Sequence, residues 1–213
     1  LGGGLSAVAE GPDFRFGRAR SGSLETLRVE GGRRGFEVIE VPERRIRLAD
    51  GLDVPARSSV VRRLLRLGRV EDAGRVLGRP ASLVGRVVRG DQRGRTIDVP
   101  TANLDLDGAM LPGDGVYAGL ATLPDGETRP AAISIGTKPT FEPTPAVAEV
   151  HVLDWDGALD DYGWTLEASL VRRLRGQERY DGLEPFLEQL GRDLEATRAV
   201  AARESARLQE ETR

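Results

Sequence analysis

The chain has 213 residues and a net charge of −3, and its 39% hydrophobic and 31% charged residues are ordinary for a globular protein. It contains no cysteine, which excludes disulfides, thiolate nucleophiles and cysteine-ligated metals. Its one histidine, His151, excludes a two-histidine zinc helix and is the only histidine that a Ser-His-Asp triad could use. The sequence around its one lysine, Lys138, lacks the glycine spacing of a P-loop.

Charge is distributed unevenly, with 16 basic and 11 acidic residues in 1–80 but 15 and 23 in 81–213. Such a split favours two units with different histories or partners. Arginines are frequent over 57–79, but acidic residues interrupt them and stacking aromatics are missing, so we interpret an exposed helix face and expect no nucleic-acid partner. No apolar run approaches the roughly 18 residues of a membrane span, and no signal peptide opens the chain. We expect a cytoplasmic protein without a membrane partner.

The first part of the chain predicts few regular elements. Residues 1–35 are rich in glycine and are interpreted as irregular, apart from a short helix over 23–29. Residues 36–41 alternate well enough to predict a strand. Apolar residues recur at helical spacing over 58–77, and Gly68 divides this stretch into two short helices.

After Pro80 the pattern changes to short alternating runs separated by glycine, proline and aspartate. Six strands are predicted, at residues 83–88, 101–106, 115–123, 130–135, 147–155 and 166–174. Short strands at this spacing are typical of an antiparallel barrel or sandwich. From residue 183 the apolar period is again that of a helix, which we expect to pack on the barrel and to fray over its charged end, 203–213.

The stretch from residue 85 to residue 103 carries the clearest chemical signal. Glycines in a loop that follows a strand let backbone N–H groups face a bound anion, and neighbouring arginines add positive charge. Beyond Pro100, the oxygens of Thr101 and Asn103 project to one face of an extended chain, and two neutral oxygens suit Mg²⁺ carrying nucleotide phosphates. We therefore predict metal ligation by Thr101 and Asn103. The nucleotide-binding residues are predicted to be Gly85, Gly90, Gly94, Arg95, Thr101 and Asn103.

Glu149 is the candidate general base. On the predicted strand, Glu149 and His151 face one way while Val150 and Val152 face the other. A carboxylate within a mostly apolar strand is costly unless it is paired or functional. Taken alone, however, Glu149 is more often an exposed edge-strand residue, and Thr101 and Asn103 belong more often to a capped turn or a strand edge. His151 is interpreted as a structural residue that hydrogen-bonds locally.

Residues 80–200 resemble the riboflavin kinase module of bacterial bifunctional riboflavin kinase/FAD synthetases, a module that also occurs alone in eukaryotes. The motifs match in chain order: the glycine loop ending at Gly94-Arg95, PTAN at 100–103, PGDGVY at 112–117, IG with PTF at 135–141, EVH at 149–151, YG at 162–163, LR at 174–175 and a closing helix with Asp193. A single short motif occurs often by chance, whereas the whole series in register makes the resemblance specific.

The resemblance implies a mainly β or α+β fold, with a six-stranded antiparallel Greek-key barrel followed by a C-terminal helix. It also implies an enzyme that transfers the γ-phosphoryl group of ATP to the 5′-hydroxyl of riboflavin, giving FMN and ADP. Thr101 and Asn103 match the residues of that family that bind the Mg²⁺–nucleotide, and Glu149 matches its proposed base. The implied partners are ATP or ADP and riboflavin or FMN.

Asp98 departs from the family pattern, because it stands where the family usually has glycine two residues before the PTAN motif. A carboxylate near bound phosphates repels them unless it points away or helps to hold the metal. A second interpretation therefore stays open, in which the chain is a non-catalytic flavin- or nucleotide-binding module.

The upstream part resembles the second half of an FMN adenylyltransferase domain more loosely, at residues 11–17 and 57–62. This implies a partial α/β nucleotidyltransferase-like remnant over 1–78, followed by the riboflavin kinase barrel and helix over 79–205. The family's adenylyl transfer uses a histidine motif that is absent here, so FAD synthesis is not expected of this chain. Because it starts at Leu1 instead of Met, we expect it to begin partway through a longer bifunctional enzyme.

Overall fold

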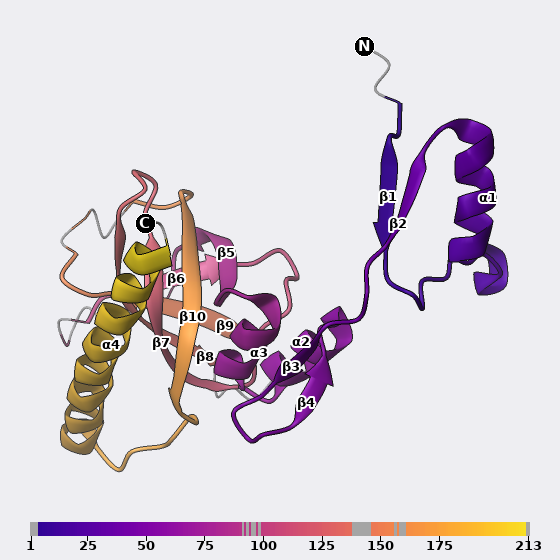
Figure 1. Cartoon of the computed structure of the whole chain (residues 1–213). Helices are drawn as coiled ribbons and strands as arrows, with labels where there is room; N and C mark the ends of the chain where they lie inside the picture. The colour runs from indigo at the N-terminus through magenta and orange to yellow at the C-terminus, as the bar shows by residue number, and fades with distance from the viewer. Residues whose placement is uncertain are drawn as a thin grey trace. The chain divides into compact units, whose positions relative to one another are not determined.

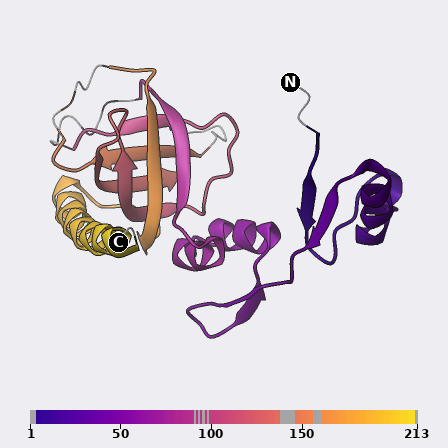
Figure 2. The same cartoon turned by 45° about the horizontal axis from the view of Figure 1, so that its top comes forward.

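The chain divides into two compact units with separate secondary structure. A computed structural model describes residues 4–90, 92, 94, 97, 99–137, 146–155, 157 and 161–211. One unit comprises Leu1–Arg47 with Gly51–Ala56, and the other comprises Leu48–Asp50 with Arg57–Arg213. Figures 1 and 2 show the elements of both units in two views.

The first unit is built around a parallel pair of strands joined by a helix. Its elements are β1 (Ala7–Glu10), a 3-10 turn (Arg18–Arg20), α1 (Leu24–Arg34), β2 (Glu37–Glu40), β3 (Arg45–Arg47) and β4 (Asp53–Pro55). β1 and β2 pair in parallel, and β3 and β4 form a short antiparallel hairpin. Ser23 and Thr26 form a capping box at the start of α1, and Gly35 ends the helix in the left-handed region at φ 77°.

The predicted helix and strand of this unit are confirmed, although the helix continues to Arg34. The interpretation of residues 1–35 as otherwise irregular is wrong at β1, which lies within them. A strand of four residues gives too short an alternation to be recognised without its pairing partner.

In the second unit, six strands close into an antiparallel barrel in the order β10-β5-β6-β9-β8-β7 (Figure 2). The strands are β5 (Ala81–Val88), β6 (Ala102–Asp105), β7 (Gly115–Thr122), β8 (Thr128–Gly136), β9 (Val147–Val152) and β10 (Thr165–Arg175). β7, β8 and β9 pair consecutively, and β10 returns to lie beside β7, which is a Greek key. The predicted six-stranded Greek-key barrel is confirmed.

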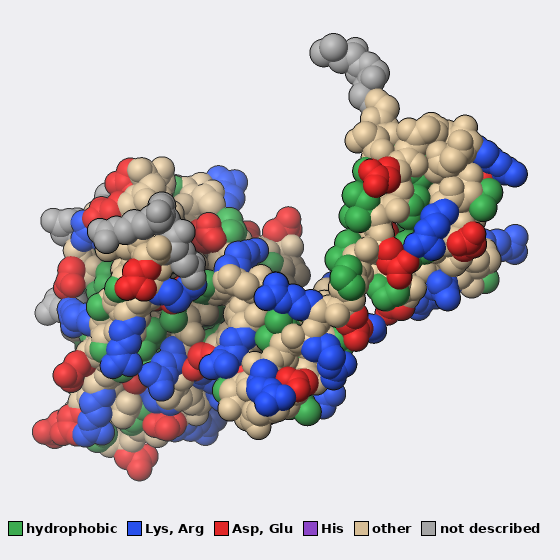
Figure 3. Space-filling view, in the orientation of Figure 1, with side chains coloured by type: hydrophobic (Ala, Val, Ile, Leu, Met, Phe, Trp, Pro, Cys, Tyr) green, Lys and Arg blue, Asp and Glu red, His purple; other side chains and the backbone are tan. Residues whose placement is uncertain are grey.

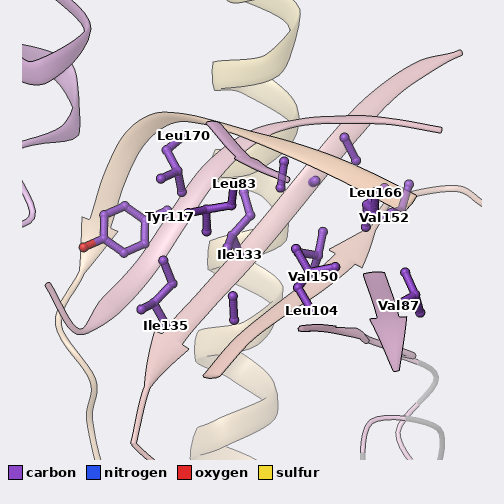
Figure 4. Close-up of a cluster of buried hydrophobic side chains, with 14 of the residues drawn as sticks. Leu83, Val87, Leu104, Tyr117, Ile133, Ile135, Val150, Val152, Leu166 and Leu170 are labelled. Atoms are coloured by element: carbon purple, nitrogen blue, oxygen red, sulfur yellow. The ribbon is translucent and has the colours of Figure 1, made fainter. Parts of the chain in front are cut away.

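Alternate residues of the barrel strands face inward and form one hydrophobic core (Figure 4). The largest of these side chains include Tyr117, Ile133, Ile135, Leu166 and Leu170, each less than 2% exposed. The hydroxyl of Tyr117 donates a hydrogen bond to the Gly113 carbonyl, which satisfies the polar end of this buried ring. The apolar residues that recur at every second position in the sequence are therefore the ones that face the inside of the barrel.

The C-terminal helix, α4 (Leu183–Glu211), covers the outside of the barrel over β7, β8 and β10. Seven of the eight residues of β7 are buried because this strand is enclosed on both faces. The predicted packing of the helix on the barrel is confirmed. We expected the turns from residue 203 to fray, but the helix continues to Glu211, and Glu204 is buried with its carboxylate paired to Arg207. Within the described residues, none of the helices is long and apolar enough to cross a membrane.

Two short helices, α2 (Ser58–Arg66) and α3 (Val70–Leu77), belong to the same compact unit as the barrel. Val70 is 1% exposed and is part of the barrel core, and the Gly113 amide donates a 2.9 Å hydrogen bond to the Leu65 carbonyl. The domain boundary between residues 78 and 79 concerns which family each part of the sequence resembles, and it stays a prediction. As a packed body, the barrel unit includes both helices.

The arginines of these helices lie mainly on an exposed face, as predicted. Arg62, Arg63 and Arg66 are exposed, and basic and acidic side chains are interspersed over the face shown in Figure 3. The exception is Arg69, which donates to buried Asp72 through Nε and Nη2 at 2.8 and 2.5 Å. The hydrogen bond to Asp72 is the main cause that raises the pKa of Arg69, so its guanidinium stays charged.

We expect removal of residues 1–78 to destabilise the barrel more than removal of residues 1–56. The longer deletion takes away α2 and α3 and exposes the core around Val70. Loss of one fully buried aliphatic side chain costs about 1.5–3 kcal/mol, which corresponds to a fall in Tm of about 5–10 °C. Thermal unfolding followed by circular dichroism measures the difference. Equal Tm values for the two truncated chains would show that the helices do not support the barrel.

Candidate active site

Two cavities of different character meet at Gly94 and Thr101, which line both of them. The first is narrow, about 40 Å³, and is lined by the glycine loop, β6 and aromatic side chains. The second is larger, about 510 Å³, and lies between the outer face of the barrel and α4. The structure thus joins a small compartment beside the glycine loop to a larger one beside α4.

In the first cavity, Asn103 lies directly beneath Gly90. A Cβ atom at Gly90 would be 2.1 Å from Asn103 Nδ2, so any other residue here would displace this amide from its present position. Asn103 is 9% exposed, and no described residue forms a hydrogen bond with its side chain. A nearly buried amide without a protein partner is uncommon and is ready to bind a ligand. This is the strongest local indication that the first cavity is a binding site.

The glycines of the predicted nucleotide site have different surroundings. At Gly94 a Cβ atom would be 2.1 Å from the Val99 carbonyl oxygen, and the Val99 amide donates to the Gly94 carbonyl at 2.9 Å, which closes the loop. Gly85 lies in the barrel wall on β5, where a Cβ atom would be 2.6 Å from the Asp105 carbonyl oxygen, and it lines neither of the two cavities. Its contribution to nucleotide binding stays a prediction.

Some predicted residues lie outside the part of the chain that the structure describes. These are Arg95, Asp98, Lys138 and the Pro-Thr-Phe motif at residues 139–141. Gln92 is described, and its Nε2 donates a 2.9 Å hydrogen bond to the hydroxyl of Tyr162, which also lines the first cavity. Trp155 and Trp164 pack edge to face there, with ring centroids 5.6 Å apart.

The carboxylate of Glu149 lines the second cavity and shares a sheet face with two other polar side chains. Glu149 is directly opposite Asn103 on β6 and Ser134 on β8. Residues opposite each other in antiparallel strands have their side chains on the same face, so an amide, a carboxylate and a hydroxyl form a row across three strands. Glu149 is half-buried, and no described residue is hydrogen-bonded or ion-paired to its carboxylate. It is therefore available to accept a proton.

The wall opposite Glu149 comes from α4 and is largely apolar. Its apolar side chains are Leu183, Phe186, Leu190 and Leu194. Tyr180, just before the helix, packs edge to face on Phe186 at 5.7 Å between ring centroids. These surfaces suit a flat or apolar part of a ligand more than a charged one.

A buried ion pair joins the end of β10 to α4 beside this cavity. Arg175 donates to Asp193 through Nε at 2.9 Å and Nη2 at 2.8 Å, and their side chains are 16% and 6% exposed. Gln189 also donates to the Asp193 carboxylate, at 2.9 Å. Burial alone would lower the pKa of Arg175, but the hydrogen bond and the charge of Asp193 outweigh it and raise that pKa. The Arg175 guanidinium stays charged, and its contact with Asp193 fixes the helix against the barrel.

Sequence reasoning missed several residues of the second cavity. Gln177 donates from Nε2 to Ser134 Oγ and to the Ile135 carbonyl, at 3.0 Å in both cases, and so connects the chain after β10 to β8. Arg175 and Asp193 lie in two of the motifs that carry the family resemblance, but the sequence alone assigns neither residue a role. No spacing in the sequence identifies these residues, because they come from segments that meet only in the folded barrel.

The geometry is that of two adjoining cavities that meet at Gly94 and Thr101. A family model described as Flavokinase, riboflavin kinase, matches residues 77–201. This is more than half of the chain, and the chain belongs to the riboflavin kinase family.

The similar curated proteins are bifunctional. The chain is 36% identical over 187 residues to the bifunctional riboflavin kinase/FMN adenylyltransferase of Escherichia coli K12, covering 87% of this chain and 57% of that protein. For the protein of the same description from Bacillus subtilis 168, the identity is 34% over 190 residues, covering 88% and 57%. The chain therefore spans less than two thirds of the length of these relatives.

A similar fold is found in a crystal structure from Streptococcus pneumoniae, described as a macrolide-efflux protein. The TM-score is 0.71 with 33% sequence identity, covering 88% of this chain and 58% of that chain. The likeness extends well beyond the barrel, because it includes most of the residues of both compact units.

We expect Asp193→Ala to destabilise the protein strongly, because it leaves the Arg175 guanidinium buried without its partner. Removing one member of a buried ion pair costs about 3–5 kcal/mol. The matched control is Arg198→Ala, which breaks the exposed pair with Asp154 and should leave the free energy of unfolding nearly unchanged. Urea denaturation measures both variants. Equal effects would contradict a stabilising role for the buried pair.

Proposed function

We propose that this chain acts as a riboflavin kinase, which transfers the γ-phosphoryl group of ATP to the 5′-hydroxyl of riboflavin and yields FMN and ADP. The observation that carries the proposal is the junction at Thr101 between a glycine-lined cavity and a largely apolar cavity, which contains the Glu149 carboxylate, bonded to none of the described residues. Membership of the riboflavin kinase family supports the same activity.

In this proposal the first cavity binds the phosphates of ATP. Bare backbone at Gly90 and Gly94 lets N–H groups approach an anion, and the predicted contributions of Gly85 and Arg95 belong to the same site. Among the described residues, no three His, Cys, Asp or Glu side chains gather to hold a metal. The neutral oxygens of Thr101 and Asn103 would instead be suitable ligands for a cation here, since Mg²⁺ commonly takes its remaining ligands from phosphates and water. When bound, Mg²⁺ neutralises charge that develops on the transferred group.

The second cavity binds the flavin in this proposal. Its volume of about 510 Å³ lies within the range of about 300–1,000 Å³ common for small-molecule sites. The apolar side of α4 faces the aromatic ring system, and the polar row on the barrel faces the hydroxyl-bearing ribityl chain. This orientation directs the 5′-hydroxyl toward the junction with the first cavity.

Glu149 is the general base of the proposed reaction. As the 5′-oxygen of riboflavin forms its bond to the γ-phosphorus, the bond from that phosphorus to the β–γ bridging oxygen breaks and ADP leaves. The hydroxyl proton passes to the carboxylate of Glu149. Positioning and charge neutralisation account for most of the catalysis of phosphoryl transfer, and a base contributes about 10²–10⁴-fold.

We also propose that residues 1–78 derive from an FMN adenylyltransferase domain and that residues 79–205 form the kinase module. We propose no adenylyl transfer by this chain, because its one histidine, His151, lies on barrel strand β9. The phosphoryl transfer would take place in the cytoplasm.

Glu149→Gln should lower kcat for FMN formation about 10²–10⁴-fold, because it removes the proton acceptor and leaves the phosphate site intact. The dissociation constant for Mg·ADP, measured by calorimetry, should stay within about twofold of the wild-type value, because ADP does not contact the base. The matched control is Glu167→Gln, since Glu167 is a half-buried strand carboxylate on β10 that lines neither cavity. Near wild-type turnover by Glu149→Gln would refute the assignment of the base.

The alternative is a flavin- or nucleotide-binding module whose kinase activity has been lost through Asp98. Incubation with ATP, Mg²⁺ and riboflavin, followed by chromatography of the flavins, separates the two functions. FMN formation supports the kinase, whereas quenching of flavin fluorescence without FMN from folded protein supports the binding module. In the second case Asp98→Gly should restore FMN formation, because it removes a charge that repels phosphate.

A further inference from the structure

His151 contacts the chain just before the predicted metal ligands. It is half-buried on β9, and its Nδ1 lies 2.7 Å from the carbonyl oxygen of Pro100. A carbonyl can only accept a hydrogen bond, so Nδ1 must carry the proton. Its imidazole lines the second cavity together with Thr101 and Glu149.

The contact lies where the backbone pairing of β6 with β9 ends. The last paired residues are Ala102 with Val150, and β6 begins at Ala102. Continuing the register by one residue places Thr101 opposite His151. Pro100 has no N–H group with which to extend the ladder. The imidazole of His151 therefore holds the Pro100 segment against β9 at the point where backbone hydrogen bonds between the two strands end.

We propose that His151 is a positioning residue, which fixes the Pro100–Thr101 segment against β9 so that the Thr101 hydroxyl and the Asn103 amide stay in register with Glu149. This inference rests on the proposed riboflavin kinase function. Thr101 is exposed and precedes the strand, and no described residue forms a side-chain hydrogen bond with it. A displacement of about 1 Å in a substrate-positioning group can cost up to about 10²-fold in rate.

The surroundings of His151 favour a neutral ring that donates from Nδ1. Burial lowers the pKa of His151, and the nearby charge of Arg198 acts in the same direction. The hydrogen bond to Pro100 and the charge of Asp154 oppose the shift without cancelling it. The ring therefore remains neutral at pH 7, with its one proton committed to Pro100.

Steady-state kinetics test the positioning role. His151→Ala should raise KM for Mg·ATP about ten- to a hundredfold, while KM for riboflavin changes much less, because the flavin contacts on α4 are untouched. His151→Asn should restore most of the affinity, because asparagine carries an N–H donor close to the position of Nδ1. The matched control is Arg198→Ala, which breaks the exposed ion pair with Asp154 and should leave both KM values unchanged.

Several outcomes would overturn the inference. These are an equal rise in both KM values for His151→Ala, no rise in either, or a His151→Asn variant no better than His151→Ala. Thermal unfolding of each variant shows whether it is folded. For folded variants, calorimetry with Mg·ADP gives the affinity without catalysis, and it should weaken by the same factor as KM in His151→Ala.

A spectroscopic test is independent of activity. Because the chain has a single histidine, the ¹H–¹⁵N correlation spectrum of its imidazole contains one set of signals. The Nδ1–H tautomer is expected in the folded wild-type protein, and the Nε2–H tautomer would refute the contact with Pro100. If the wild-type protein makes no FMN, the proposed function fails, while this spectrum and the Mg·ADP affinities still decide whether His151 positions the segment.

Discussion

The antiparallel pairing of β6 with β9 is the constraint on which the site depends. It places Asn103 opposite Glu149, and thereby brings a proposed phosphate-side ligand next to a proposed base. Both strands are held by their other neighbours in a closed barrel, so neither can slip without disrupting the core. A slip of one residue would turn Glu149 inward and Val150 outward, which buries a charge and exposes an apolar side chain. The same packing that stabilises the barrel therefore fixes the geometry of the chemistry.

The second cavity depends on how α4 is held against the barrel. The buried pair of Arg175 and Asp193 fixes the helix at one side of the cavity, and Gln177 connects the preceding chain to β8. These contacts leave a space between helix and sheet whose walls are apolar on one side and polar on the other. The flavin that we propose for this cavity would match that division, because its aromatic ring and its hydroxylated chain would each meet a surface of its own polarity.

Most of the barrel could be predicted from the sequence, because most of its strands alternate buried and more exposed residues, and glycine and proline mark the turns between strands. The elements that escaped prediction, β1, β3 and β4, have only three or four residues each. Their alternation is too short to be significant, and pairing with a partner strand defines them. The candidate site was partly predictable, because Thr101, Asn103 and Glu149 lie in short motifs that can be recognised locally in the sequence.

Local order along the chain determined which residues form strands, which faces turn inward and where polar groups interrupt apolar runs. Tertiary structure alone decided that Gly90 lies on the Asn103 amide, that Arg175 pairs with Asp193 and that His151 holds the Pro100 carbonyl. It also placed α2 and α3 with the barrel. The physical reason is that each of these contacts joins residues distant in sequence, and no local propensity or periodicity records which distant segments the closed barrel brings together.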